Sequence, residues 1–407
     1  MKVVFSILLS LFGFSSLQAQ LLPNAKMELM VDIVYLSSDL LGGRETGTPQ
    51  EQMAADYIAY RFQESGLSPK GSESWMQGFE FDFKPNPHGE VEERRTGHNV
   101  VAYLDNNAAT TVIIGAHYDH LGMGHFGSRH TGEPAIHNGA DDNASGVAAL
   151  FQIAEAISGP AYAANNYLFI AFSGEELGLY GSKYFINNAT IDMSQVNYML
   201  NLDMVGRLNE EGMLVINGAG TSPVWKEVLP EIKQGNIQIK TTDSGIGPSD
   251  HTSFYLNDIP VLHFFSGQHA DYHKPEDDSE LVNYQGVTDI SAFIVQLIGS
   301  LNDNGRLVFT KTVDESADRE VSDFKVTLGV MPDYVYDGTG MRVDGVISDR
   351  PAEAAGVQRG DVIIKIGNVA VKDIYDYMDG LAKFNKGDKT TVVVQRGTEE
   401  ITLKVKF

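Results

Sequence analysis

Short apolar segments that alternate with amphipathic ones constrain the fold of this chain most. Strand-like apolar runs occupy 111–116, 167–172, 198–203 and 261–265, and a helical pattern fills 144–157 between the first two. A repeated order of strand, helix and strand is typical of a largely parallel sheet that carries helices on both faces. The sequence therefore predicts an α/β fold with a mostly parallel central sheet.

The chain is long enough for more than one domain. It has 407 residues, and a domain commonly takes about 100–200. A helical pattern at 286–301 is followed by the polar, charged stretch 302–321, which has the composition of a linker. Residues 322–407 then show short strands, glycine turns and one helix, at the size of a small independent domain. We predict one domain over 20–301 and a second over 322–407.

The first residues have the composition of a secretory signal. A basic start at Met1-Lys2 precedes the apolar run 3–14, and the small residue Ala19 stands near the end of the segment. This run is too short to span a bilayer. We predict a signal peptide at 1–19 and therefore export, to a periplasm or out of the cell; a buried N-terminal helix is the alternative. No later apolar run has the length of a transmembrane segment.

Charge and cysteine usage narrow the class of protein. The chain carries 30 basic and 54 acidic residues, a net charge of −24. Binding to nucleic acid or to an anionic membrane by general attraction is therefore not expected. There is no cysteine, so a zinc site here has only His, Asp and Glu as ligands. Such ligands suit catalytic rather than structural zinc.

Residues that bind metals follow the predicted strands. The carboxyl ends of parallel strands meet at one edge of a sheet, and ligands bind at that edge. The candidates that directly follow a strand, precede the helix 144–157 or lie beyond the strand 261–265 are His117, Asp119, Asp141, Asp142, Glu175, Glu176, Asp203 and His273.

Each candidate has an ordinary structural explanation when it is taken alone. A histidine after a strand commonly bonds within its loop, Asp141-Asp142 before a helix can act as a cap, and Glu175-Glu176 can form a solvated turn. Together, two histidines and at least four carboxylates at one sheet edge repel each other unless cations lie among them. Two zinc ions about 3.5–4 Å apart would neutralise the cluster and activate a water molecule.

The ordered motifs resemble metallopeptidase family twenty-eight, which includes the bacterial leucyl and related two-zinc aminopeptidases. The resemblance covers about 26–301, and the segment 39–48 is also similar to one near the start of such domains. It implies a zinc aminopeptidase fold of the phosphorylase/hydrolase-like kind. The motifs that carry it are His117-x-Asp119, Gly139-Ala-Asp-Asp-Asn-Ala-Ser-Gly146, Ser173-Gly-Glu-Glu176, Asn201-Leu-Asp203 and Tyr272-His273.

The resemblance implies a metal ligand at five positions of this sequence and two zinc ions per chain. His117 and Asp203 match the ligands of one zinc. Glu176 and His273 match those of the other. Asp142 matches the carboxylate that bridges both ions.

The resemblance also implies roles for residues beside the metals. Glu175 matches the general base that acts on a metal-bridged water, and Asp119 matches a carboxylate that orients His117. Tyr272 is similar to a tyrosine that stabilises the oxyanion in some members, with packing as the alternative. The peptide bond between Asp142 and Asn143 is expected to be cis.

Other polar residues receive less specific expectations. We expect Asp141 to be structural, and the cluster Ser249-Asp250-His251 to shape the pocket, with a catalytic role of His251 as the alternative. The histidines of the loop after the first strand are expected to be mostly solvated, with contact of one of them to substrate left open; they are His120, His125, His130 and His137.

Residues 322–407 resemble a PDZ domain of the kind found in exported bacterial proteases. The motif from Pro351 to Asp361, Pro-Ala-x-x-Ala-Gly-Val-x-x-Gly-Asp, carries this resemblance. Such a domain accepts an extended peptide as an added strand, and the backbone N–H groups around Leu328, Gly329 and Val330 would surround its terminal carboxylate. The alternative is an appendage whose groove is empty or blocked.

The combined expectation is an exported zinc aminopeptidase. It would remove N-terminal residues from peptides with a free N-terminus, and its PDZ-like domain would bind a peptide or a protein partner. Two alternatives stay open: a glutaminyl cyclase-like enzyme with a single zinc, and a non-catalytic peptide-binding protein.

Overall fold

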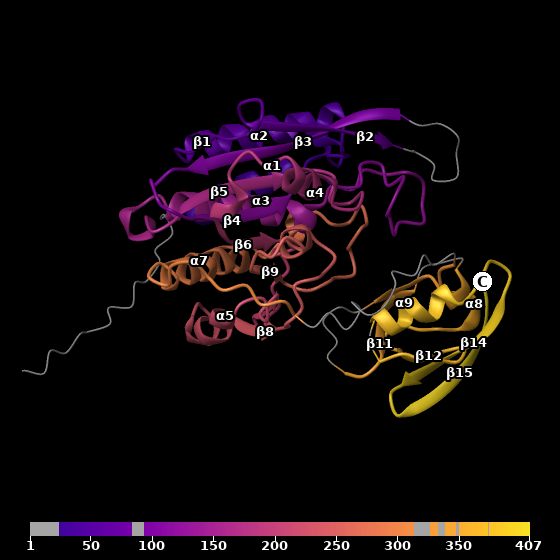
Figure 1. The fold of residues 1–407 in the computed structure, drawn as a ribbon. Helices are drawn as coiled ribbons and strands as arrows, with labels where there is room; N and C mark the ends of the chain where they lie inside the picture. Colours follow the sequence, from indigo (N-terminus) through magenta and orange to yellow (C-terminus); the bar gives the residue numbers. More distant parts are fainter. Residues whose placement is uncertain (1–23, 84–92, 313–325, 333–337, 347–349, 373) are drawn as a thin grey trace, which may run out of the picture.

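The computed structural model describes residues 24–83, 93–312, 326–332, 338–346, 350–372 and 374–407 (Figure 1). The predicted signal peptide at 1–19 and the end of the predicted linker lie outside these residues. The described residues form two bodies, a larger one built from 24–312 and a smaller one built from 326–407. Within the described residues, no helix is long and apolar enough to cross a membrane.

Among the described residues, the first domain contains one large sheet, seven helices and several short helical turns. Its strands are β1 (Ser68–Pro69), β2 (Met76–Phe83), β3 (Glu93–Leu104), β4 (Thr111–His117), β5 (Asn166–Phe172), β6 (Val196–Leu202), β7 (Met213–Asn217), β8 (Gln238–Thr241) and β9 (Val261–Phe265). Its helices are α1 (Ala25–Leu36), α2 (Pro49–Glu64), α3 (Gly146–Ala156), α4 (Tyr180–Asn187), α5 (Pro223–Val228), α6 (His251–Tyr255) and α7 (Tyr284–Ser300). The short turns are η1 (Asp39–Leu41), η2 (Ala140–Ser145), η3 (Pro160–Tyr162), η4 (Met193–Gln195), η5 (Leu229–Glu231) and η6 (Ser279–Leu281).

The centre of the sheet is parallel and its margins are partly antiparallel. The strand order is β1-β3-β5-β4-β6-β9-β7-β8, and β2 pairs with β3. Strands β5, β4, β6 and β9 run parallel, whereas β3 is antiparallel to β5 and β7 is antiparallel to β9. The predicted mostly parallel sheet is confirmed, and the four strands predicted from apolar runs are its four central strands.

Helices cover both faces of this sheet, as predicted. On one face α1, α2, α3 and α7 pack together over a large apolar core, and on the other face α4 and α6 cover a second core. Strands β4, β5 and β6 are buried along their whole length and β9 is buried up to Phe264, because both faces are covered. Their sequences are therefore continuous apolar runs rather than alternating ones.

The register of the central strands brings their carboxyl ends level. His117 at the end of β4 pairs with Phe172 at the end of β5, and Gly115 of β4 pairs with Asn201 of β6. The segments that begin at Tyr118, Ser173 and Asp203 therefore leave the sheet side by side. This edge carries most of the candidate metal ligands.

The segment 302–312, the first part of the predicted linker, lies against the first domain. Leu307 is only 8 % exposed, and its N–H donates to the side chain of Asn197. The N–H of Thr310 donates to the carbonyl of Thr221. The hydroxyl groups of Tyr255 and Thr312 lie 2.8 Å apart.

The second domain is an antiparallel sheet with two helices over a small core of its own. Strand β10 forms one edge of the sheet in the order β10-β11-β12-β14-β15. The elements are β10 (Val330–Pro332), β11 (Met341–Val346), α8 (Pro351–Ala355), β12 (Val362–Ile366), β13 (Val369–Ala370), α9 (Ile374–Ala382), β14 (Lys389–Arg396) and β15 (Glu399–Lys406).

Candidate metal centre

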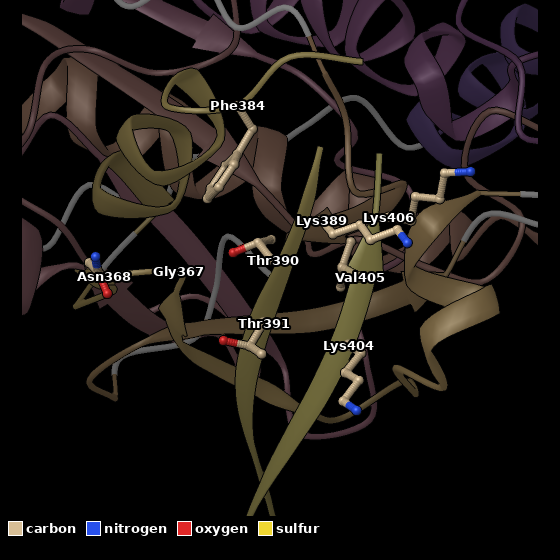
Figure 2. A pocket seen from close by; sticks show the side chains of 9 residues that line it. All are labelled: Gly367, Asn368, Phe384, Lys389, Thr390, Thr391, Lys404, Val405 and Lys406. Carbon is tan, nitrogen blue, oxygen red and sulfur yellow. The ribbon is translucent and has the colours of Figure 1, made fainter. Parts of the chain in front are cut away.

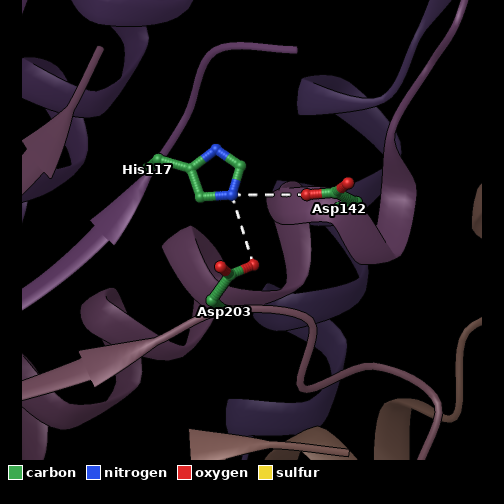
Figure 3. A group of neighbouring side chains, drawn as sticks. All are labelled: His117, Asp142 and Asp203. Carbon is green, nitrogen blue, oxygen red and sulfur yellow. Dashed lines mark hydrogen bonds and ion pairs between the residues drawn. The ribbon is translucent and has the colours of Figure 1, made fainter. Parts of the chain in front are cut away.

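Two groups of potential metal ligands meet at the carboxyl edge of the sheet, and they share Asp142. In the first group, Nε2 of His117 lies 3.2 Å from Oδ1 of Asp203 and 3.3 Å from Oδ1 of Asp142 (Figure 3). In the second, Nε2 of His273 lies 3.2 Å from Oδ2 of Asp142 and 3.2 Å from Oε2 of Glu176. The structure thus brings together all five residues predicted as ligands.

The two oxygens of Asp142 therefore face different histidines. Oδ1 points toward His117, and Oδ2 points toward His273. A carboxylate in this orientation can hold one cation with each oxygen. The arrangement is the geometric counterpart of the bridge that the resemblance implied.

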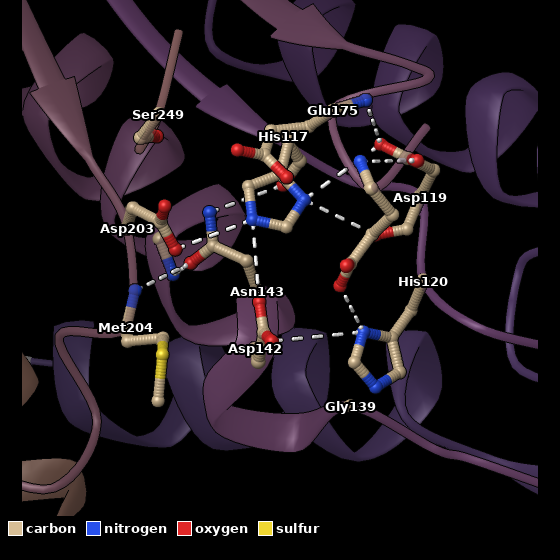
Figure 4. Close-up of polar contacts among 12 residues, drawn as sticks. His117, Asp119, His120, Gly139, Asp142, Asn143, Glu175, Asp203, Met204 and Ser249 are labelled. Carbon is tan, nitrogen blue, oxygen red and sulfur yellow. Dashed lines mark hydrogen bonds and ion pairs between the residues drawn. The ribbon is translucent and has the colours of Figure 1, made fainter. Parts of the chain in front are cut away.

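Local structure fixes the loop of Asp142. The peptide bond between Asp142 and Asn143 is cis, as predicted. The side chain of Asn143 donates to the carbonyl of His117 and accepts from the N–H of Met204 (Figure 4). It also donates to the carbonyl of Leu202 and accepts from the N–H of Gly146. This buried amide ties the start of α3 to the ends of β4 and β6.

Asp119 is fully buried and contacts both the first histidine and the Glu175-Glu176 turn. Its Oδ1 lies 3.7 Å from Nδ1 of His117, and its backbone carbonyl lies 3.2 Å from the same nitrogen. Its carboxylate also accepts the N–H groups of Glu175 at 3.1 Å and Glu176 at 3.4 Å. Thr46 donates to Oδ2 of the same carboxylate. Asp119 is therefore placed to orient His117 and also holds the turn that carries both glutamates.

His120 lies inside the site, where the sequence interpretation had placed it in solvent. Its side chain is buried, and its Nδ1 lies 2.9 Å from Oε1 of Glu176 and 3.9 Å from Oδ2 of Asp142. His120, Asp142 and Glu176 thus form a further group with metal-binding geometry, which shares both carboxylates with the group of His273. The pattern His117-x-x-His120 directly after a strand was the available signal for it.

His137 is also buried, so the expectation of mostly solvated loop histidines is wrong for His120 and for His137. The ring of His137 lies 2.7 Å from the hydroxyl of Ser128 and 2.9 Å from the carbonyl of Ala135. Its hydrogen bonds stay within its own loop. His125 is exposed, and His130 is half-buried.

The many carboxylates of the cluster favour positive charge among them. Burial alone lowers the pKa of a histidine, yet the carboxylates around His117 and His273 raise the pKa of both well above the ordinary value. Burial raises the pKa of Glu175 well above its ordinary value, and the nearby carboxylates of Asp203 and Glu176 add to the shift. This donor set of imidazole and carboxylate groups fits divalent zinc.

A second layer of charged residues lies behind Asp142. The carboxylate of Asp141, predicted to be structural, accepts from the N–H of Gly206 and the hydroxyl of Ser145. Its other oxygen lies 3.2 Å from Nε2 of His269. Asp277 accepts the N–H groups of both Asp141 and Asp142. Sequence reasoning gave no role to His269 or Asp277.

A buried arginine connects the loops that carry the candidate ligands. Arg44 is 1 % exposed and donates to the carbonyls of Tyr118, Asn138 and Gly139 and also to that of Leu36. Burial lowers its pKa to about 10, against the opposing effect of Asp119 and other nearby carboxylates. The guanidinium remains charged at neutral pH and lies under the segments that lead to His120 and Asp142.

Tyr272 packs directly on a candidate ligand. Its ring stacks on that of His273 with the ring centres 3.8 Å apart. The guanidinium of Arg129 also lies over the ring of Tyr272, 5.5 Å from its centre. Burial and the carboxylate of Asp142 raise the pKa of Tyr272 well above its ordinary value. Its hydroxyl therefore keeps its proton.

The cluster Ser249-Asp250-His251 is buried beside the site. Ser249 accepts from the side chain of Asn201, next to Asp203. Burial raises the pKa of Asp250 to about 7. The ring of His251 stacks on that of His263 at 4.5 Å. Within the described residues, His251 has no interaction with a candidate ligand. It therefore belongs to the buried surroundings of the site.

The predicted carboxylate loop of the second domain precedes its edge strand β10. Leu328 is buried, and its carbonyl accepts from the N–H of Ala352. Gly329 has a φ of +76°, and a Cβ there would lie 2.2 Å from Cβ of Arg350, so glycine is needed. Its N–H donates to the hydroxyl of Thr327. Val330 begins β10.

A cavity of about 580 Å³ lies elsewhere in the second domain, on strands β14 and β15 (Figure 2). Its walls include Lys389, Lys404 and Lys406 and the ring of Phe384. Lys389 and Lys406 are direct cross-strand partners. None of the candidate metal ligands lines this cavity.

Several curated proteins are similar in sequence to part of this chain. Among curated proteins, leupeptin-inactivating enzyme 1 of Streptomyces exfoliatus is 32 % identical over 257 residues, which are 62 % of this chain and 50 % of that protein. An aminopeptidase of Bacillus subtilis is 28 % identical over 184 residues, 42 % of this chain and 37 % of that protein. The chain thus spans half or less of the length of these two relatives.

Solved structures show the same fold at lower identity. BSAP, a zinc aminopeptidase from Bacillus subtilis, aligns with a TM-score of 0.52 at 17 % identity, over 71 % of this chain and 99 % of that chain. A glutaminyl cyclase of Bacteroides thetaiotaomicron aligns with a TM-score of 0.55 at 16 % identity, over 69 % and 99 %.

Models of two protein families match consecutive parts of the chain. The model described as peptidase family M28 matches 99–298, which includes every candidate ligand. The model described as PDZ domain matches 319–407. The chain therefore carries a domain of peptidase family M28 followed by a PDZ domain.

Proposed function

We propose that this chain is an exported, zinc-dependent aminopeptidase that removes residues from the N-terminus of peptides. The observation that carries the proposal is the orientation of Asp142, whose two oxygens face His117 and His273 in two adjoining ligand groups. Two cations held in this manner would neutralise a cluster that otherwise concentrates carboxylates in a buried place.

His117 and Asp203 would hold one zinc, and Glu176 and His273 the other, with Asp142 shared by both. His120 is a further candidate for the second ion because its Nδ1 lies 2.9 Å from Glu176. When bound, zinc supplies Lewis-acid polarisation of a carbonyl and lowers the pKa of water. The resemblance to two-zinc aminopeptidases supports two ions rather than one.

Glu175 is the proposed general base. Its backbone N–H donates to Asp119, and its raised pKa makes the ionised carboxylate a stronger base for the proton of the attacking water. It would then return this proton to the amine that leaves. A general base of this kind contributes about 10²- to 10⁴-fold to a rate.

The acidic surroundings suit a substrate with a free, positively charged N-terminus. The α-amino group of a peptide would lie among the carboxylates at the cluster, as in the family that the sequence resembles. Tyr272 keeps its proton and could donate a hydrogen bond to the oxygen of the carbonyl under attack.

The PDZ domain would bind an extended peptide along the edge strand β10, with the terminal carboxylate near Leu328 and Gly329. Binding there would raise the local concentration of peptide or partner beside the first domain. Export rests on the composition of 1–19. Mass spectrometry of the mature protein should show a chain that begins after Ala19, and an intact Met1 in the exported form would contradict export by this signal.

A glutaminyl cyclase is the second candidate, because a solved glutaminyl cyclase shares the fold. A direct comparison separates the two: purified protein is given Leu-Ala-Ala and Gln-Ala-Ala peptides, and the products are identified by mass. Release of free N-terminal residues supports the aminopeptidase. Loss of ammonia from the glutamine peptide without hydrolysis of either peptide would overturn it.

A further inference from the structure

Asp277 is a buried carboxylate that no step of the proposed mechanism uses. Its side chain is fully buried, and it lies four positions after His273 in the sequence. One of its oxygens, Oδ2, accepts two hydrogen bonds, from the N–H of Asp141 at 2.9 Å and from that of Asp142 at 3.0 Å. Its backbone carbonyl accepts a third, from the N–H of Ala140 at 2.9 Å.

These three N–H groups belong to the helical turn η2, which leads into α3. The first N–H groups of a helix or helical turn have no partner within it and need an acceptor from elsewhere. Here Asp277 supplies the acceptor, from a loop that lies 135 to 136 positions further along the chain. The backbone of Asp142 is thereby attached to the loop of His273.

The same loop carries a candidate ligand. A turn in which the N–H of Asp277 donates to the carbonyl of Lys274 separates it from His273. His273 itself is oriented by the carbonyl of Gly127, which lies 2.9 Å from its Nδ1. Asp277 thus links the two residues, Asp142 and His273, whose side chains lie 3.2 Å apart in the second ligand group.

A cation holds Asp277 in place from behind. Nη2 of Arg207 lies 3.4 Å from Oδ1 of Asp277 and 3.1 Å from Oδ2 of Asp271. His269 lies 3.9 Å from Oδ1 of Asp277 and 3.7 Å from Asp271. Asp271 therefore shares the charged neighbours of Asp277, but among the described residues no hydrogen bond joins it to the turn of Asp142.

We propose that Asp277 is a positioning residue for the metal centre. It holds the backbone of Asp142 so that one carboxylate oxygen faces each histidine. This inference rests on the proposed metal-dependent function and adds a residue to it. Partners in the second layer of a metal site commonly change metal affinity by about 10- to 100-fold when they are removed.

The test measures zinc affinity, with zinc alone as the probe, by competition against a chromophoric chelator. Asp277→Ala removes the acceptor and is expected to weaken zinc binding by about 10- to 100-fold. Asp277→Asn leaves a carbonyl oxygen that can accept both N–H groups, and it is expected to lose roughly 3- to 10-fold, because a neutral acceptor binds more weakly than a charged one.

Asp271→Ala is the matched control. It removes the other carboxylate bonded to Arg207. It should leave zinc affinity within about twofold of wild type, since the second-layer groups that tune a metal site are those that hold its ligands. Unfolding of all variants in the presence of a chelator separates positioning from folding. A positioning role predicts that Asp277→Asn unfolds close to Asp271→Ala while binding zinc more weakly.

Wild-type zinc affinity in Asp277→Ala would overturn the proposal. If that variant does not fold, Asp277→Asn decides, and an affinity equal to wild type overturns it in the same way. An equal loss in Asp271→Ala and Asp277→Asn would also overturn it, because the effect would then come from charge alone. If the wild-type protein itself binds no zinc, the proposed function is refuted. That result is distinct from a failure of the Asp277 proposal, in which wild type and variants bind zinc equally well.

Discussion

Glu175 and Glu176 are adjacent residues with separate tasks, and a single amide substitution at each should distinguish them. Glu176 lies within 3.2 Å of His273 and 2.9 Å of His120, whereas Glu175 is not part of either ligand group. Glu175→Gln should therefore keep its zinc and lose turnover by about 10²- to 10⁴-fold, because a proton acceptor is removed. Glu176→Gln should lose zinc as well.

The measurement is kcat with a leucyl peptide beside zinc content by atomic absorption. Near-normal kcat in Glu175→Gln would remove Glu175 from the role of base. A zinc content reduced equally in both variants would make Glu175 a ligand instead.

Arg44 should prove essential for folding rather than for turnover. Its guanidinium bonds to four backbone carbonyls, and Arg44→Met would remove a charged donor from each of them. Each lost bond from a charged donor costs about 1.5–3 kcal/mol, so we expect a loss of more than about 4 kcal/mol. Denaturant unfolding of the metal-free protein measures it, and a loss under 1 kcal/mol would show that the loops hold without this residue.

Single residues also mark the limit of what the sequence predicts. The five predicted ligands and Glu175 belong to short motifs that follow predicted strands in a characteristic order, so the sequence alone identifies them as candidates. Arg44 and Asp277 act through backbone carbonyls and N–H groups of distant segments. Those partners have no side-chain signature in the sequence, and only the folded loops reveal them.

Among the elements, α1 and α2 are joined by a buried ionic contact that should make stability depend on pH. Asp32 of α1 accepts from the hydroxyl of Tyr57 and pairs at 2.8 Å with Arg61, both of α2. Burial nevertheless raises the pKa of Asp32 from 3.8 to about 6. The folded protein thus holds a proton that the unfolded chain releases between these values.

The free energy of unfolding should therefore fall as pH rises from about 4 to 6, by up to about 3 kcal/mol from this group. Asp32→Asn does not titrate, so the difference between wild type and this variant isolates the contribution. Denaturant unfolding of both metal-free proteins between pH 4 and 8 measures it. A difference that is constant with pH would contradict the account.

Elements were predicted with uneven success, for reasons of burial. The four central strands are apolar throughout because helices cover both faces, and such runs are easily recognised. Strand β2 alternates buried residues with partly or fully exposed ones and β8 has no buried residue, so neither forms a continuous apolar run. The antiparallel margins of the sheet were accordingly absent from the prediction.

At the scale of the whole molecule, the boundary of the first domain should lie after Thr312 rather than after Leu301. A chain that ends at Thr312 keeps the buried side chain of Leu307 and the bonds of Thr310 and Thr312. A chain that ends at Leu301 loses them, which costs about 3–6 kcal/mol from one buried leucine and several hydrogen bonds. Thermal unfolding of both compares them, and equal midpoints would make 302–312 a plain linker.

The central claim is that the carboxylates gathered around Asp142 hold two zinc ions on which hydrolysis depends. The most direct test removes metal with a chelator, adds zinc back in steps, and follows bound zinc and release of leucine from a leucyl peptide together. The account predicts that activity disappears on chelation and returns fully as the bound zinc approaches two ions per chain. Saturation at one ion with full activity, or hydrolysis that persists without metal, would contradict it.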